Sequence, residues 1–387
     1  NEDIGSCSYL DAFSGKLYGS QDGISYSQNG NSNLKWEKQN IYDIGAELSF
    51  LNRFNFTAAY WKKKNTDIVL QAPTPPSLGV PGNVISQNVG SLVNHGLEFE
   101  LSGKVVKTND FEYNLSLNFS TQYNKVTKLL SDMMYQFTII REGESMRSLY
   151  GFEYMGVNMA NGYPLYKKAD NTIVQGNPTN SNYYVYDAAN PGTLGALSSL
   201  SASDKKILGN TIPKWFGGVD NNFKYKNFDM NIFFRFSGGN KVANVTRRDM
   251  MTMSFQNNST EILDRWQSTS NPGNGDVPII MSGKGSFLNL ESDGSSRWIE
   301  NGNFLKLQNV SIGYTLPKII TNKLTLEKVR FYVQGQNLLT LTKYSGLDPE
   351  AFSSSTDSSG AEIYGTGVDW NGNPQQRSFV IGLNVVF

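Results

Sequence analysis

The sequence predicts an all-β protein, specifically an antiparallel transmembrane β-barrel. Polar and apolar residues alternate with period two in segment after segment. The connections between these segments alternate between short turns and very long loops. Aromatic residues make up 12% of the chain, and 37 glycines accompany them, while only 39% of the residues are hydrophobic. A barrel strand alternates lipid-facing with lumen-facing residues, so an ordinary overall hydropathy is compatible with a membrane location.

Period-two alternation is clearest between Tyr113 and Tyr123. Leu115, Leu117 and Phe119 share one face there, and Asn and Ser residues occupy the other. No stretch reaches the ~18 to 20 apolar residues of a membrane-spanning helix. The alternating pattern predicts nine strands, over residues 34–51, 54–71, 90–105, 111–127, 214–225, 227–240, 301–316, 327–341 and 374–387.

The connections fall into two classes that alternate along the chain. Residues 51–53, 107–110 and 226–227 form tight hairpin turns. The long loops include residues 127–213, 241–300 and 342–373. This alternation is typical of an outer-membrane barrel, with turns on the periplasmic side and loops outside. A surface adhesin or glycan-binding β-sandwich is the alternative, although sandwich strands usually span only ~5–6 residues. A sandwich would stay soluble without detergent.

Nine is an odd number of strands, whereas bacterial single-chain barrels have even numbers. Unpaired strand edges are not tolerated in hydrocarbon, because each unsatisfied backbone group costs several kcal/mol. We therefore expect further barrel strands to precede Asn1.

Charge and composition exclude several classes of function. The 34 Lys and Arg residues balance 34 Asp and Glu residues, so the basic surplus of a nucleic-acid-binding protein is missing. A single cysteine, Cys7, allows no internal disulfide framework. A single histidine, His95, leaves no partner of its kind for a metal site. We expect no catalytic residues, no metal site and no cofactor, and hence no enzyme.

An ordered series of motifs adds specificity. Asn88–Glu98 contains an Asn-Val-Gly followed by Asn-His-Gly-Leu-Glu, and Ile207–Lys214 reads Leu-Gly-Asn followed by Pro-Lys. The other motifs are Asn33–Glu37, Arg141–Ser145 with Tyr150–Tyr154, Asn303–Val310 and Gln334–Leu338. Together they resemble the C-terminal barrel of the SusC-like (SusC/RagA) TonB-dependent transporters of the Bacteroidota.

The resemblance implies the last nine strands of a 22-stranded barrel with a plugged lumen. Residues 1–387 would then be the C-terminal part of that barrel, and the plug, the TonB box and the earlier strands would be absent. It implies active import of oligosaccharides or oligopeptides across the bacterial outer membrane. The implied partners are a SusD-like surface lipoprotein, a TonB–ExbB–ExbD complex that acts through the missing N-terminal region, and outer-membrane lipid with lipopolysaccharide.

Two groups of residues are candidates for function. The polar faces of the predicted strands would line the lumen, and the long loops would bind substrate and partner. The lumen-facing candidates for substrate binding are Glu98, Glu100, Asp229, Arg235, Gln334 and Gln336. Phe379 and the terminal Phe387 share one face of the last strand, and the resemblance implies that they signal outer-membrane assembly. Asp264-Arg265-Trp266 marks either an interface or a loop that packs on itself.

Overall fold

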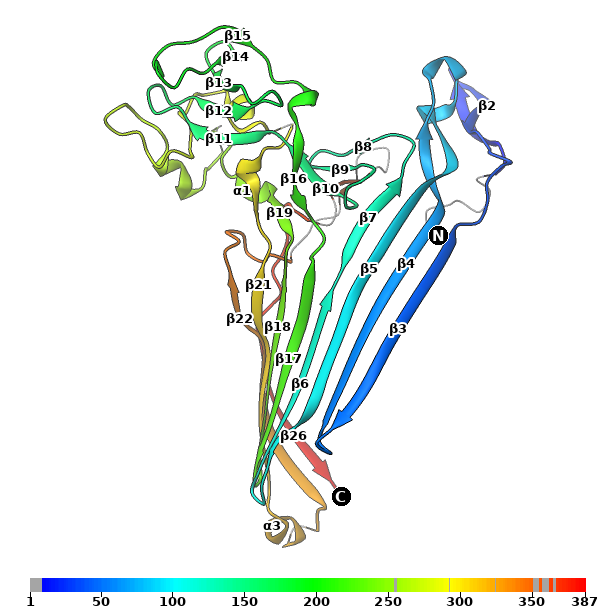
Figure 1. The fold of residues 1–387 in the computed structure, drawn as a ribbon, viewed down its shortest axis with the longest axis vertical. Coiled ribbons are helices and arrows are strands. Elements are labelled where there is room, and N and C mark those ends of the chain that lie inside the picture. The colour runs from blue at the N-terminus through cyan, green and yellow to red at the C-terminus, as the bar shows by residue number, and fades with distance from the viewer. Residues whose placement is uncertain are drawn as a thin grey trace.

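The computed structural model shows one tall, curved β-sheet with folded loops gathered at one end (Figure 1). It describes residues 9–253, 256–291, 293–323, 325–350, 355–356, 362–364 and 367–387. Cys7 lies outside these residues, as do parts of the predicted loop 342–373. No helix in the described ranges is long and apolar enough to cross a membrane.

Nine strands form the large sheet, and each pairs antiparallel with its neighbours in chain order. They are β3 (Lys38–Phe50), β4 (Phe54–Pro73), β5 (Val84–Lys107), β6 (Phe111–Thr121), β17 (Trp215–Tyr225), β18 (Phe228–Gly238), β21 (Phe304–Thr315), β22 (Lys328–Thr342) and β26 (Ser378–Val386). A short strand, β7 (Tyr123–Lys128), continues β6 and also pairs with β5. The nine predicted strands are confirmed. The β-sandwich alternative is wrong, because these strands make one sheet and not two stacked layers.

The turn end of the sheet is the end at which the tight connections lie. Leu51 and Asn52 both adopt left-handed backbone angles, with φ of 53° and 52°. The turn is closed by Arg53 N–H, which donates to the carbonyl oxygen of Phe50 at 3.3 Å, and positive φ at both of its central residues matches the twist of the flanking strands. The connection from β21 to β22 is longer and contains α3 (Lys318–Lys323). Figure 1 shows α3 as the element farthest from the loops.

The opposite end, the loop end, carries the remaining elements. The first long loop holds a four-stranded sheet and a five-stranded sheet. The strands of the two sheets are β8 (Met133–Met134), β9 (Thr138–Ile140), β10 (Ser148–Gly151), β16 (Lys206–Asn210), β11 (Glu153–Val157), β12 (Pro164–Lys167), β13 (Ile173–Asn177), β14 (Asn182–Val185) and β15 (Leu197–Ser198). A 3₁₀ turn, η3 (Ala202–Asp204), precedes β16.

The other loops carry shorter elements. The second long loop contains β19 (Lys241–Asn244), α1 (Val245–Asp249), η4 (Thr260–Asp264), α2 (Gly285–Asn289), η5 (Ser296–Trp298) and β20 (Ile299–Asn301). The third contains β23 (Ser355–Thr356), β24 (Glu362–Tyr364) and β25 (Val368–Asp369). Near the start of the chain lie β1 (Ala12–Tyr18) and β2 (Gln21–Gln28). The connection between β4 and β5 contains η1 (Pro76–Leu78) and η2 (Pro81–Asn83).

The clusters of buried apolar side chains lie among the loops at the loop end. One cluster joins Phe137 and Leu149 of the first long loop, Ala243 and Val245 of the second, and Val368 of the third. Two further clusters centre on Tyr166 with Phe152 and on Trp298 with Met251. The three long loops therefore pack into one folded unit, held by the same burial of apolar surface that stabilises a globular core.

Candidate functional site

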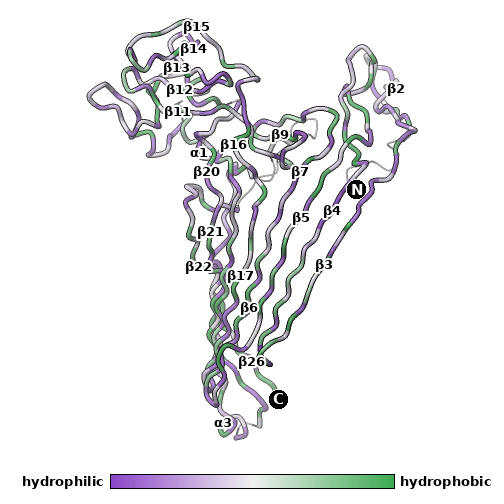
Figure 2. The backbone as a smooth tube through the Cα atoms, viewed as in Figure 1, coloured by the Kyte–Doolittle hydropathy of each residue, from purple (hydrophilic) through white to green (hydrophobic). Residues whose placement is uncertain are grey.

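The strand register divides the large sheet into two chemically different faces. Residues directly opposite each other in antiparallel strands share a face. On β18, Phe228, Met230 and Ile232 lie opposite Tyr314, Ile312 and Val310 of β21 and form part of an apolar face. Residues between them form a polar face. In Figure 2 hydrophobic and hydrophilic residues alternate along the strands of the large sheet.

All six candidate binding residues fall on the polar face. Glu98 lies opposite Ser120, and Glu100 lies opposite Asn118. On strands farther along the sheet, Asp229 and Arg235 of β18 lie opposite Gly313 and Lys306 of β21. Gln334 and Gln336 of β22 lie opposite Ser311 and Asn309. Phe233, which breaks the simple alternation of β18, also lies on this face, opposite Asp220. The register therefore places the candidates on one surface, but in separate groups.

A chain of side-chain amides crosses four strands of the polar face. Gln334 Nε2 donates to Asn309 Oδ1 at 2.7 Å, and Asn309 Nδ2 donates to Asn231 Oδ1 at 2.8 Å. Asn231 Nδ2 donates onward to Asn222 Oδ1 at 2.9 Å and also to Asp220. Each central amide uses its oxygen as acceptor and its nitrogen as donor, which satisfies groups that would otherwise be costly to bury. We call these residues the amide ladder.

Partners hold three of the candidates on the polar face, namely Asp229, Arg235 and Gln336. The Arg330 Nε donates to Asp229 Oδ1 at 2.9 Å, so the Asp229 carboxylate is engaged. Arg235 pairs with Glu350 of the third long loop. The Gln336 amide oxygen accepts from Ser378 Oγ at 3.3 Å. These contacts restrict the geometry in which the candidates could meet a ligand.

Arg235 belongs to a cluster of four charged groups at the loop end. Lys306 of β21 is only 3% exposed, and its Nζ lies 2.8 Å from Asp348 Oδ1 and 2.6 Å from Glu350 Oε2. Asp348 and Glu350 come from the third long loop. We call Arg235, Lys306, Asp348 and Glu350 the ion cluster, because two cations and two carboxylates neutralise one another there. It fixes the loop to the wall of the sheet.

The environment of Asp348 shifts its acidity. Burial acts to raise the pKa of the Asp348 carboxyl, but hydrogen bonds from the Lys306 ammonium and from the backbone N–H groups of Glu350 and Gln375 prevail and lower it. The pKa therefore lies below the ordinary value of 3.8, and the carboxylate stays charged at neutral pH.

A hollow of about 240 Å³ lies beside the ion cluster. Asn118 of β6, Phe216 of β17, Phe233 and Arg235 of β18, and Glu350 contribute to its walls. Aromatic and charged groups meet there at the junction between the polar face and the loops. Among the six candidates, Arg235 is the one that lines this hollow.

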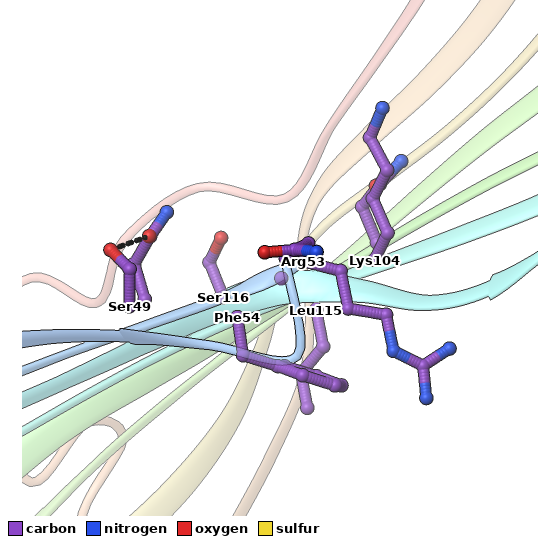
Figure 3. A pocket seen from close by; sticks show the side chains of 10 residues that line it. Ser49, Arg53, Phe54, Lys104, Leu115 and Ser116 are labelled. Atoms are coloured by element: carbon purple, nitrogen blue, oxygen red, sulfur yellow. Dashed lines mark hydrogen bonds between the residues drawn. The ribbon is translucent and has the colours of Figure 1, made fainter.

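A second and larger hollow, of about 660 Å³, lies at the turn end. Figure 3 shows that Ser49, Ser116 and Lys104 project to one side of the sheet, whereas Phe54 and Leu115 project to the other. The separation of polar from apolar side chains therefore persists down to the turns.

The segment Asp264-Arg265-Trp266 packs within the folded loops. The Trp266 indole Nε1 donates to the carbonyl oxygen of Met159 at 2.9 Å, which joins the second long loop to the first. The Arg265 Nη1 donates to the carbonyl oxygen of Ile262 at 3.2 Å. These contacts favour the loop-packing interpretation of the segment over an interface.

Sequence reasoning missed Lys306, Glu350 and the members of the amide ladder other than Gln334. The alternation of β21 could have placed Lys306 on the polar face, but it carries no information about the loop that supplies its partners.

Phe379 lies on the apolar face of β26 and is 70% exposed, and Phe387 is 91% exposed. Within the described ranges, no three His, Cys, Asp or Glu side chains are grouped to hold a metal ion.

The chain that forms this two-faced sheet matches a known protein family. The family described as "TonB dependent receptor-like, beta-barrel" matches residues 8–338. The chain belongs to this family. It is thus part of an outer-membrane β-barrel of the TonB-dependent transporters, which are not enzymes.

Similar proteins include receptors from two bacteria. The chain is 32% identical over 384 residues to TonB-dependent receptor P3 of Formosa agariphila, covering 95% of this chain and 36% of the relative. It is 29% identical over 367 residues to TonB-dependent receptor SusC of Bacteroides thetaiotaomicron, covering 92% of this chain and 32% of the relative. The resemblance to SusC-like receptors is therefore confirmed.

Solved structures agree on the fold. The RagAB peptide transporter superposes over 100% of this chain with a TM-score of 0.79 at 24% identity, and 40% of that chain is covered. The chain thus spans between about a third and two fifths of the length of the relatives that it matches.

Proposed function

We propose that this chain forms the C-terminal part of the barrel of a transporter that actively imports oligosaccharides or oligopeptides across the outer membrane. The observation that carries the proposal is the two-faced sheet. Its apolar face suits lipid, and its polar face suits a water-filled interior. Earlier strands of the complete receptor would close the nine strands into a 22-stranded barrel. The N-terminal part of the receptor would also contain a plug domain and a TonB box.

The polar face supports a substrate that is a chain of hydrogen-bonding groups. The amide ladder presents neutral donors and acceptors across four strands, and the ion cluster is internally balanced. Hydroxyl groups of sugars and backbone amides of peptides can both replace water at such surfaces. SusC is similar to this chain in sequence, and the RagAB peptide transporter shares its fold. The Arg235 hollow adds aromatic and charged contacts at the entrance.

The folded loops support docking of a SusD-like surface lipoprotein. Large apolar side chains remain exposed on them, including Leu197 at 69%, Leu263 at 66% and Leu347 at 76%. Exposed apolar groups on an otherwise well-packed unit are common at protein interfaces. Energy would come from a TonB–ExbB–ExbD complex acting through the N-terminal region of the complete receptor.

Uptake by living cells tests this proposal. Cells that carry the complete receptor are given labelled oligosaccharide and oligopeptide mixtures, with and without a functional TonB. We expect uptake of one class, its loss without TonB, and its reduction by Arg235→Gln but not by Lys343→Gln at an exposed loop-end position. Uptake of neither class, or uptake that persists without TonB, would contradict the proposal.

A further inference from the structure

An aromatic row marks where the apolar face ends near the turns. Phe111, Tyr225, Phe228, Tyr314 and Phe331 lie directly opposite one another, in that order, across five adjacent strands. The Phe228 and Tyr314 ring centroids are 4.6 Å apart. Aromatic girdles occupy the boundary between hydrocarbon and water in membrane barrels. The periplasmic boundary of the membrane therefore runs along this row.

Positive charge is concentrated at the turn end, around and beyond the aromatic row. The turn-end segments 51–55, 104–112, 224–229 and 315–330 contain nine Lys and Arg residues but only four Asp and Glu residues, although the whole chain has no net charge. The cations are Arg53, Lys104, Lys107, Lys224, Lys226, Lys318, Lys323, Lys328 and Arg330. This end of the molecule is therefore electropositive, whatever ligand the receptor imports.

Carboxylates of the turn end leave several of these cations unmatched. Asp229 pairs with Arg330, and Asp110 lies 3.8 Å from Lys226. Within the described part of the chain, no ion pair involves Arg53, Lys318 or Lys323, all of which are exposed. The Arg53 Nη1 donates to the carbonyl oxygen of Val105 at 3.5 Å, which leaves its other N–H groups for a ligand. Those groups and the two ammonium groups can meet an anion from outside.

Two of the cations are held against rings on the apolar face. The Arg53 guanidinium lies 5.2 Å from the centroid of the Phe54 ring, and the Lys226 ammonium lies 5.6 Å from the centroid of the Tyr225 ring. Figure 3 shows Arg53 on the side of Phe54 and Leu115, away from Lys104 and Ser49. These charges therefore lie on the lipid side of the sheet.

Helix α3 adds exposed apolar side chains at the turn end, beyond the aromatic row (Figure 1). Ile319 is 76% exposed and Ile320 is 44% exposed, and Lys318 and Lys323 flank them. Exposed isoleucines between lysines form a segment that is suited to the boundary between headgroups and acyl chains. In water they would expose apolar surface with no compensating contact.

We propose that Arg53, Lys226, Lys318 and Lys323, with Ile319 and Ile320, form a basic rim that binds anionic phospholipids in the periplasmic leaflet of the outer membrane. The cations meet the headgroup phosphates, and the two isoleucines insert among the headgroups beyond the aromatic row. Charge complementarity and the position beside the aromatic row both identify this occupant. Lipid binding at the basic rim does not depend on which substrate is imported. An experiment can therefore contradict lipid binding without contradicting transport.

Native mass spectrometry of the complete, detergent-purified receptor tests the basic rim. The probes are phosphatidylglycerol and phosphatidylcholine with identical acyl chains. The rim variant carries Gln at Arg53, Lys226, Lys318 and Lys323. The matched control carries Gln at four exposed lysines near the loop end, namely Lys64, Lys125, Lys128 and Lys343. A shift in gel mobility on heating verifies that each variant is folded.

We expect the rim variant to lose at least about tenfold in affinity for phosphatidylglycerol, because each basic residue near an anionic surface contributes roughly fivefold. Its affinity for phosphatidylcholine should stay the same, as should both affinities of the control. The double variant Ile319→Asn/Ile320→Asn should bind both lipids more weakly. An unchanged preference for phosphatidylglycerol in the rim variant, or an equal loss in the control, would overturn the proposal. Unchanged binding by the isoleucine variant would overturn the anchoring role of α3.

Discussion

Replacing Lys306 by Met should release the third long loop from the wall of the sheet. The Lys306 ammonium contacts both oxygens of Asp348, at 2.8 and 3.0 Å, as well as Glu350 at 2.6 Å. Asp348 is itself only 5% exposed. Methionine fills a similar volume but carries no charge. The variant would therefore leave a buried carboxylate whose neutralising partner is gone.

The expected cost follows from this burial. Removal of one partner of a buried ion pair typically costs about 3–5 kcal/mol, since the remaining charge stays desolvated. Expressed as local opening of the loop, this corresponds to an increase of roughly a hundredfold to a few thousandfold in the open population. Arg235 still neutralises part of the charge of Glu350, so the penalty falls mainly on Asp348.

Hydrogen–deuterium exchange measures this opening directly. Peptides from residues 367–377 should exchange faster in the Lys306→Met variant, and peptides from β4 should not change. Lys343→Met, at an exposed position in the same loop, should leave exchange as in the parent protein. A second change, Asp348→Leu in the Lys306→Met background, should restore most of the protection, because an apolar pair can replace a buried ion pair. Unchanged exchange in Lys306→Met would show that the Lys306 ammonium does not hold the third long loop to the sheet.

The effect of pH on this loop has a defined sign. The pKa of Asp348 is lower in the folded protein than its ordinary value of 3.8, so the stabilisation is complete above that value. It is lost as the pH falls through the lowered, folded-state pKa. We therefore expect constant protection between pH 7 and about pH 5 and a loss below about pH 4. In Lys306→Met, burial acts without its counter-charge, so acidification should instead improve protection.

Three further predictions concern other parts of the molecule. Asn309→Ala should lower the free energy of unfolding in detergent by about 1–3 kcal/mol, because Asn231 and Gln334 each lose a hydrogen bond. The control Ser311→Ala should have little effect. Leu149→Ala should cost about 2–5 kcal/mol within the loop unit and expose the loops to limited proteolysis, unlike Leu194→Ala at an exposed site. Phe387→Ala should reduce the amount of folded receptor recovered from the outer membrane, measured by its gel mobility before heating.

The strands of the large sheet were predictable because their signal is local. A half-buried strand alternates with period two, so its face assignment can be read from the sequence alone. The same rule put Asp229 and Arg235 on one face despite the intervening Phe233, which lies on that face as well. The predicted strand 90–105 was too short, since β5 begins at Val84, and the break after Thr121 was not visible in the pattern.

The ion cluster and the loop unit could not be predicted in this way. Lys306 lies 42 residues from Asp348 along the chain, and Arg235 lies 115 residues from Glu350. Their pairing depends on how separate loops fold against the sheet. The buried cluster around Leu149 and Val245 likewise draws on three loops. Such contacts leave no periodic signal in the sequence. The binding roles of the polar-face candidates and the assembly role of Phe379 and Phe387 stay predictions.

The most direct test of the two-faced sheet is cysteine labelling along β18 in a Cys7→Ser background. Single cysteines replace Asn231, Ile232, Phe233 and Phe234 in the complete receptor, reconstituted in lipid bilayers. We expect a water-soluble maleimide to label positions 231 and 233, whereas a probe at positions 232 and 234 should be quenched by lipid-phase quenchers. Labelling without alternation, or with the opposite phase, would contradict the assignment of lipid and lumen faces.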